Sequence, residues 1–366
     1  MNDGLYLSLS EQDYRDERRL SASGLCSLLV SPATFWARSW MNTDKQDDDT
    51  MARRLGRAYD VAILTPDQFE ARYVRELDHA DNALMTMTDI GEQLAALGEP
   101  KKKAGESVLA SAQRLRAAGY EGPIKHLDED AWEAERADRE PLPGALFDRV
   151  VDEAERVHQD PDISKLMSGG ASQVSVLWTD AAGMKWKARF DYLAPGFVTD
   201  LKTFSNAHGK PLDQCIADAV RYSRYYVQAM LYWRAAEMVR KGEMVGQDEG
   251  AADLVQRVMF GPPMEWWWVF RETGGVPNVL ARQFRMTSDA HPHHLYQAPD
   301  PHSDAEYLRK LERPSGLAKK ADAEIKMAVS LYRQAMEVWG EAEPWGAMVP
   351  VGEIGDDDFN PRWLEE

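Results

Sequence analysis

The 366-residue chain contains only two cysteines, Cys26 and Cys215. Two thiols in a chain of this length suit a reducing compartment, so we expect a cytoplasmic protein, and they are too few for a zinc site built from cysteine. The eight histidines show no spacing typical of a zinc site. No G-x-x-x-x-G-K-[ST] segment is present, so the sequence gives no support for a P-loop ATPase.

Long apolar runs are also missing. No stretch approaches the roughly 18 consecutive apolar residues that a membrane-spanning helix needs, so we expect no membrane association. The first residues have neither a basic start nor an apolar core, and we therefore expect no signal peptide. With 44% hydrophobic and 28% charged residues, the composition is that of a globular protein long enough to bury a sizeable core.

Basic residues are in short supply, because 43 Lys and Arg face 61 Asp and Glu and give a net charge of -18. Proteins that bind nucleic acid are usually basic, since phosphate contacts dominate their affinity. The deficit argues against such a function unless the acidic residues lie on outer faces, or bound cations supply positive charge where a phosphate sits. Net charge bears on solubility and steering and does not decide the fold or the site.

Hydrophobic periodicity separates helical from extended segments. Ser21 or Ser23 is expected to cap an early helix, and Thr65-Pro66 to end a helix over 51–64. Residues 67–160 are predicted to be a helical insertion with loops at 99–106 and 120–145. Strands are predicted at 172–178, 184–193, 197–204, 264–270 and 279–286, and helices at 212–241 and 303–340. The pattern predicts an α/β fold in one domain over 1–366, with a mixed central sheet flanked by the 51–64 and 212–241 helices and a catalytic core over 172–286.

The segment from Asp191 to Lys202 carries the strongest chemical signal. Side chains alternate along a strand, so Asp200 and Lys202 point to the same side of the predicted strand FVTDLKTF. A two-residue turn at Pro195-Gly196 would place Asp191 opposite Asp200, with β-carbons roughly 4.5–5.5 Å apart. Two carboxylates that close repel one another unless a cation lies between them.

This arrangement suits a magnesium site. Mg²⁺ uses one or two carboxylates together with waters and substrate phosphate, and Asp191 and Asp200 offer the carboxylates. Lys202 could orient or help deprotonate a water and stabilise charge on phosphoryl oxygens. The alternative is an ordinary surface hairpin with two exposed acids and a lysine paired to one of them.

A second signal lies in the helical segment RYSRYYVQAMLYWRA. Gln228 and Tyr232 are four residues apart and share a helix face. Arginine and tyrosine together suit phosphate contact and base stacking, and one to two turns earlier this segment carries Arg221, Tyr222, Arg224, Tyr225 and Tyr226. The alternative is an amphipathic helix whose tyrosines pack on the sheet. The run at Lys101–Lys103 is more typical of a solvated loop than of a DNA contact.

Together these segments resemble the exodeoxyribonuclease VIII (RecE-type) branch of the PD-(D/E)XK nucleases, within the RecB-like group. LSASGLCSLLVSPATFW resembles its opening helix, VSVLWTDAAGMKWKARFDYL with VTDLKTF its catalytic hairpin, and YYVQAMLYW its Q-x-x-x-Y helix. LGRAYDVAILTPDQFEARYV resembles its G-x-x-x-H helix and LYRQAMEVWGEAEPW its closing helix. The resemblance covers most of the chain and implies a restriction-endonuclease-like fold.

The resemblance also implies roles for individual residues. Asp191 and Asp200 would bind Mg²⁺ or Mn²⁺, Lys202 would be the catalytic lysine, and Gln228 and Tyr232 would support the site and the DNA strand. The family's helix histidine falls on Asp60, which can still bind a hard cation. The acidic residue that often precedes the hairpin falls on Gln173, which is a poorer metal ligand.

Three functions follow from these observations. The first is a metal-dependent DNA exonuclease acting on duplex ends in recombination or repair, and "exo" comes from the resemblance alone. The second is a DNA-end-binding or interaction protein with a weakened site, which Asp60, Gln173 and the acidic charge suggest. The third is a structure-selective endonuclease or nickase. The resemblance also implies a homo-oligomer, a ring of three or four subunits, and a single-strand annealing protein as a partner.

Overall fold

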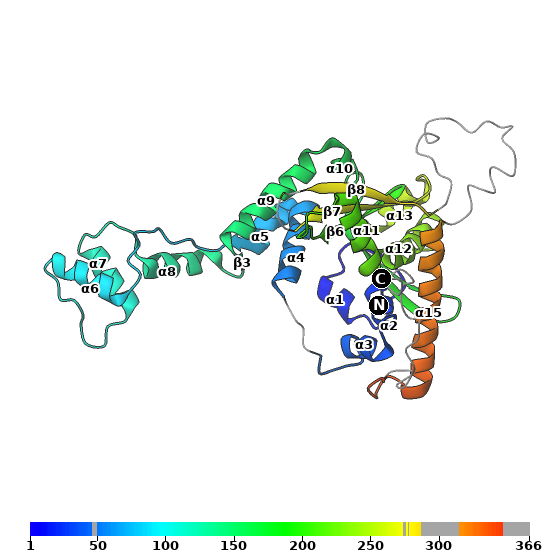
Figure 1. Cartoon of the computed structure of the whole chain (residues 1–366), viewed down its shortest axis with the longest axis horizontal. Helices are drawn as coiled ribbons and strands as arrows, with labels where there is room; N and C mark the ends of the chain where they lie inside the picture. The colour runs from blue at the N-terminus through cyan, green and yellow to red at the C-terminus, as the bar shows by residue number, and fades with distance from the viewer. Residues whose placement is uncertain (46–49, 274–275, 277, 287–314, 347–366) are drawn as a thin grey trace, which may run out of the picture. The chain divides into compact units, whose positions relative to one another are not determined.

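A computed structural model describes residues 1–45, 50–273, 276, 278–286 and 315–346. The chain divides into two compact units. The sheet unit comprises Met1–Asp49 and Asp160–Glu366, and the helical unit comprises Thr50–Gln159. Figure 1 shows the elements of both.

A six-stranded sheet forms the centre of the sheet unit, in the order β1-β4-β5-β6-β7-β8. Its strands are β1 (Gly4–Tyr6), β4 (Ala171–Thr179), β5 (Lys185–Ala194), β6 (Phe197–Phe204), β7 (Glu265–Glu272) and β8 (Val279–Phe284). Neighbouring strands are antiparallel except β6 and β7, which run parallel. The mixed α/β sheet predicted from the sequence is confirmed, with the β5–β6 hairpin at its centre.

Helices from distant parts of the chain cover this sheet. Helix α12 (Tyr225–Arg240) contacts β5 and β7, and also contacts α2 (Ala22–Leu28) and the long α15 (Gly316–Trp339) (Figure 1). Ten of its residues are buried, as expected for a helix enclosed between a sheet and other helices. Ser21 caps α2 by accepting a hydrogen bond from the Gly24 amide. Within its described residues, the unit also contains α1 (Glu11–Asp16), α3 (Pro32–Arg38), α10 (Pro161–Lys165), α11 (Leu212–Tyr222) and α13 (Ala251–Met259).

The helical unit begins with α4 (Met51–Leu64), the helix that the sequence predicts with these bounds. Helix α4 contacts α9 (Gly144–Gln159). The other elements are η1 (Pro66–Gln68), α5 (Phe69–Arg72), α6 (Met87–Ala96), α7 (Val108–Ala117), α8 (Lys125–Arg136), and a two-stranded parallel sheet of β2 (Tyr73–Arg75) and β3 (Glu140–Leu142). A small apolar cluster holds α6 and α7 together around Ile90, Leu94 and Leu115.

Several sequence predictions are wrong in detail. The predicted 212–241 helix is broken between α11 and α12, because Arg224 adopts a left-handed backbone with φ of 51°. The predicted 120–145 loop contains α8, whose polar composition hides a half-buried face. Helix α13 and strand β1 are missed because they depend on packing rather than on strong local patterns. Of the predicted 303–340 helix, 303–314 lie outside the described residues.

Across the described residues, no helix is both long and apolar enough to cross a membrane.

Candidate active site

The β5–β6 hairpin brings Asp191 and Asp200 into neighbouring positions. Tyr192 pairs with Thr199 and Ala194 with Phe197, so the turn consists of Pro195 and Gly196 and the next residues along the register are Asp191 and Asp200. Gly196 has a φ of 93°, the left-handed value that a type II turn requires after proline. The sequence predicts this register from the two-residue turn.

The two strands separate directly beyond this hairpin. Their backbone pairing ends at Tyr192 and Thr199, and the Leu201 amide instead donates a 2.7 Å hydrogen bond to Asp191 Oδ2. A side-chain carboxylate therefore takes the place of a backbone carbonyl between the strands. This bond fixes Asp191 beside the segment of β6 that carries Asp200 and Lys202.

Asp200 lies at the centre of the cluster and is only 2% exposed. Lys202 Nζ is 2.5 Å from Asp200 Oδ2. Gln228 Nε2, on α12, donates a 2.9 Å hydrogen bond to Asp200 Oδ1. Asp191, Asp200, Lys202 and Gln228 are thus brought together from two strands and one helix, as the sequence interpretation requires.

Burial and charge shape the ionisation of this cluster. Burial raises the pKa of Asp200 to about 7, because the attraction of Lys202 only partly offsets the loss of solvation and the repulsion by Asp191. Burial also raises the pKa of Asp191. Burial alone would lower the pKa of Lys202, but the two carboxylates outweigh it and raise that pKa above its ordinary value. Lys202 is therefore held as an ammonium group.

Two tyrosines of α12 lie around these groups. Lys202 Nζ lies 5.1 Å from the ring centroid of Tyr225, a cation–π distance. Tyr232 is 7% exposed and packs edge-on against Phe190 and Trp266. Its hydroxyl forms a hydrogen bond with Tyr14 of α1. Tyr225 thus lies next to the lysine, whereas Tyr232 lies in the core and braces the helix that presents Gln228.

Gln173 lies beside Asp191 on the other neighbouring strand. Its flanking residues pair with Tyr192 and Phe190, and its own φ of 54° is rare for a residue other than glycine. Gln173 Oε1 accepts a 3.0 Å hydrogen bond from Arg189 Nε. The amide therefore occupies the position beside Asp191 but is engaged by an arginine.

Sequence reasoning missed Arg189 as a member of this group. Arg189 also donates to the Leu9 carbonyl at 2.9 Å and lies 5.7 Å from the Tyr14 ring centroid. The available signal was its position two residues before Asp191 on the same strand. Nothing in the sequence indicates that α1 packs over it.

The remaining predicted residues are placed differently. Arg221 is exposed and lies 5.5 Å from the ring centroid of Tyr222. Arg224 Nε is 3.6 Å from Glu324 Oε2 on α15, so its charge is already partly matched. Asp60 is half-buried on α4 in the helical unit, and its part in the site stays a prediction.

The sheet-unit residues suit a hard divalent cation. Asp200 Oδ2 is a buried carboxylate oxygen whose close partner is the Lys202 ammonium, 2.5 Å away, and two buried carboxylates beside one lysine leave negative charge that a divalent cation would offset. Asp191 supplies a second carboxylate. Within the described parts of the chain, no three or more His, Cys, Asp or Glu side chains gather to hold a metal. The set on β5 and β6 is therefore a carboxylate pair, the number that Mg²⁺ commonly takes from protein.

Comparison with known proteins bears on this arrangement. The model of the family described as "PDDEXK-like domain of unknown function (DUF3799)" matches residues 21–245, well over half of the chain. The chain belongs to this PDDEXK-like family. The match includes the hairpin, Lys202 and the α12 residues around them, and it places the chain in the PD-(D/E)XK nuclease superfamily with a restriction-endonuclease-like fold. The match does not assign the chain to the RecE-type branch of that superfamily.

Among solved structures, the chain is similar to a crystal structure described as a "putative exonuclease" from Eubacterium rectale. The identity is 15%, the match covers 75% of this chain and 86% of that chain, and the TM-score is 0.32. No curated protein matches this chain.

Proposed function

We propose that this PDDEXK-like protein is a divalent-metal-dependent deoxyribonuclease that hydrolyses phosphodiester bonds from duplex ends. The observation that carries the proposal is the buried pair of Asp200 and Lys202, 2.5 Å apart, with Asp191 next in register. Asp200 is only 2% exposed, whereas the carboxylate of an ordinary surface ion pair would be open to solvent. Perturbed and desolvated charges of this kind cluster at functional sites.

The chain's own residues have distinct tasks in this proposal. Asp191 and Asp200 would hold Mg²⁺, with Mn²⁺ as a substitute, and the bound cation would polarise the phosphoryl group and acidify a water. Lys202, kept as an ammonium group by the carboxylates, donates to the phosphoryl oxygens where negative charge develops. Gln228 holds the orientation of Asp200, and the Leu201 amide holds that of Asp191.

DNA contact is assigned to the surface around α11 and α12. Arg221, Tyr225 and the exposed side of Arg224 offer charge and aromatic surface for the strand, while Gln228 and Tyr232 support the site from behind. These arginines and the bound metal would place positive charge next to the phosphates, although the overall charge is -18. Affinity for DNA depends on the charge near the phosphates.

The test is release of nucleotides from linear duplex DNA in Mg²⁺, in Mn²⁺ and in chelator, with covalently closed circular DNA as the second substrate. We expect metal-dependent degradation of linear DNA and none by Asp200→Asn. Asp253→Asn serves as the matched control, since Asp253 is an exposed aspartate of α13 whose partner is Arg257 on the same helix. Cleavage of the circle would instead indicate a structure-selective endonuclease or nickase.

A second candidate function is DNA-end binding with a weakened nuclease site. It is favoured by Gln173, whose uncharged amide is already bonded to Arg189 and offers a metal less than a carboxylate would. Under this alternative linear DNA is bound but not degraded in either metal. Gln173→Glu would then raise cleavage, whereas the exonuclease proposal expects cleavage by the wild type.

The wider setting is part of the proposal and follows from the resemblance. We infer a cytoplasmic protein that acts in recombination or repair, in a ring of three or four subunits, with a single-strand annealing protein as partner. Multi-angle light scattering tests the assembly. A monomer at micromolar concentration would contradict the ring.

A further inference from the structure

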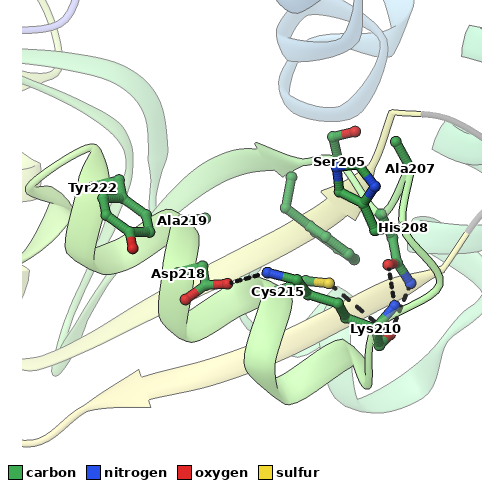
Figure 2. A pocket seen from close by; sticks show the side chains of 10 residues that line it. Ser205, Ala207, His208, Lys210, Cys215, Asp218, Ala219 and Tyr222 are labelled. Carbon is green, nitrogen blue, oxygen red and sulfur yellow. Dashed lines mark hydrogen bonds and ion pairs between the residues drawn. The ribbon is translucent and has the colours of Figure 1, made fainter. Parts of the chain in front are cut away.

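A pocket of about 200 Å³ opens just beyond the end of β6 (Figure 2). One wall is the loop that follows the strand, with Ser205, His208 and Lys210. The other wall is α11, with Cys215, Asp218 and Tyr222. Phe204 contributes an aromatic ring to the lining. None of these residues belongs to the carboxylate–lysine cluster.

The pocket is nonetheless connected to that cluster. Phe204 follows Lys202 by two residues, so both side chains lie on the same side of β6, about 7 Å apart along the strand. Phe270 lies opposite Lys202 in register on the neighbouring strand β7. Its ring centroid is 6.5 Å from that of Phe204 and 6.4 Å from that of Tyr225. Phe270 and Phe204 are 0% and 4% exposed, so one packed layer of aromatic core residues lies behind both Lys202 and the pocket.

The lining combines apolar walls with a polar rim. Lys210 Nζ and Asp218 Oδ2 form a 3.0 Å ion pair across the opening (Figure 2). Each keeps hydrogen-bonding capacity, because an ammonium has three donors and a carboxylate has further acceptor sites. Tyr222 stands at one end, is 72% exposed and lies 5.5 Å from the Arg221 guanidinium, so most of its ring is accessible to a further stacking partner.

The loop wall is preformed. Asn206 Oδ1 accepts from the Lys210 amide at 2.8 Å, and Asn206 Nδ2 donates to the Lys210 carbonyl at 3.0 Å. Gly209 takes a φ of 62°, which lets the loop turn back on itself. Because these hydrogen bonds hold the loop in one conformation, a ligand can bind without the entropic cost of ordering the loop.

We propose that the pocket takes one unpaired nucleobase of the DNA strand whose phosphate lies at Asp200 and Lys202. A single base offers a flat face for the exposed ring of Tyr222 and an edge with adjacent donors and acceptors for Lys210 and Asp218, while the largely buried Phe204 lines the pocket between them. The pocket is too small for a base pair, so a duplex must be open at that position. This inference rests on the proposed nuclease function and adds recognition of an unpaired end to it.

The experiment measures DNA affinity with the full-length Asp200→Asn protein, so that the DNA survives. Linear duplexes carry a four-nucleotide single-stranded end, of either polarity, in which each base in turn is replaced by an abasic site. We expect one position at which base removal weakens binding by about tenfold, the size of one aromatic stacking contact. In a Tyr222→Ala background the same abasic site should change affinity less than twofold.

Matched variants separate this effect from general loss of binding. Tyr222→Phe keeps the ring and should keep the tenfold response. Phe260→Ala removes an aromatic that is 81% exposed and lies outside the pocket, and it should also keep the response. Because Tyr222 is exposed, Tyr222→Ala should melt at the wild-type temperature.

Two outcomes would overturn the inference while leaving the nuclease proposal in place. In one, the wild type degrades linear DNA but no abasic position affects binding. In the other, the tenfold loss persists unchanged in Tyr222→Ala. If neither cleavage nor DNA binding is found, the proposed function itself fails, and the inference fails with it.

Discussion

Replacing Asp200 with asparagine removes one negative charge from a buried group that holds two carboxylates and one ammonium. The variant keeps the shape of the side chain and lets the remaining Asp191 and Lys202 balance one another. Since the pKa of Asp200 is raised to about 7 by burial, its ionisation destabilises the folded protein in the absence of metal. We therefore expect Asp200→Asn to be more stable than the wild type at pH 8 in chelator.

The magnitude follows from proton linkage. A rise in pKa from 3.8 to about 7 means that ionising Asp200 costs the folded state about 4 kcal/mol relative to the unfolded state. An asparagine oxygen cannot accept fully from both Gln228 and Lys202, and the poorer hydrogen bonding costs about 1 to 2 kcal/mol. The expected net gain is about 2 to 3 kcal/mol above pH 7.

The stability of the wild type relative to Asp200→Asn depends on pH. Between pH 4 and 7 the folded wild type binds more protons at Asp200 than the unfolded chain, so its stability falls as the pH rises through this window. Asparagine does not titrate, so near pH 4 the variant should be about 1 to 2 kcal/mol less stable than the wild type, because only its poorer hydrogen bonding counts there. The variant should gain on the wild type across the window and keep a constant advantage above pH 7.

Urea unfolding followed by circular dichroism at several pH values measures this difference. Added Mg²⁺ provides the second arm, because a cation that binds only the folded wild type stabilises it by mass action. The stability advantage of the variant should shrink or reverse in Mg²⁺. A variant that is no more stable than the wild type at pH 8 in chelator would refute the account of Asp200 as a buried, repelled carboxylate.

Three further predictions follow from the contacts. Lys202→Met should lower the cleavage rate by about 10² to 10³. It should also destabilise the metal-free protein by about 3 kcal/mol, because two buried carboxylates lose their neighbouring ammonium group. Single-turnover kinetics measure the first effect and urea unfolding the second, and near-wild-type cleavage would exclude an electrostatic role for Lys202. Lys187→Met should destabilise by about 2 kcal/mol, because Lys187 Nζ donates to the carbonyls of Tyr14, Arg15 and Glu17 at the end of α1; an unchanged unfolding midpoint would contradict this. Asp60→Ala should weaken Mg²⁺ binding in a calorimetric titration, and unchanged affinity together with unchanged cleavage would place Asp60 outside the site.

Local sequence was sufficient for the hairpin and for the order of its chemical groups. The alternation in FVTDLKTF and the two-residue turn at Pro195-Gly196 depend on neighbours a few residues away, so they predicted β6 with its observed bounds and the register of Asp191 with Asp200. The spacing in α12 likewise put Gln228 one turn from Tyr232. The end of helix α4 was predictable for the same reason, from the terminating Thr65-Pro66.

Tertiary packing determines the burial and the ionisation of these groups. The burial that raises the pKa of Asp200 arises because α12 lies on the sheet, and the hydrogen bond from Gln228 crosses 28 residues. Tyr232 became a core residue through contacts with Phe190, Trp266 and Tyr14, which no local pattern relates. Helices α11 and α12 are separate because Arg224 adopts a left-handed backbone, whereas helical periodicity alone favours one unbroken helix. Sequence patterns determine which side chains are close along the chain, and desolvation, which sets their chemistry, depends on segments that meet only in the folded protein.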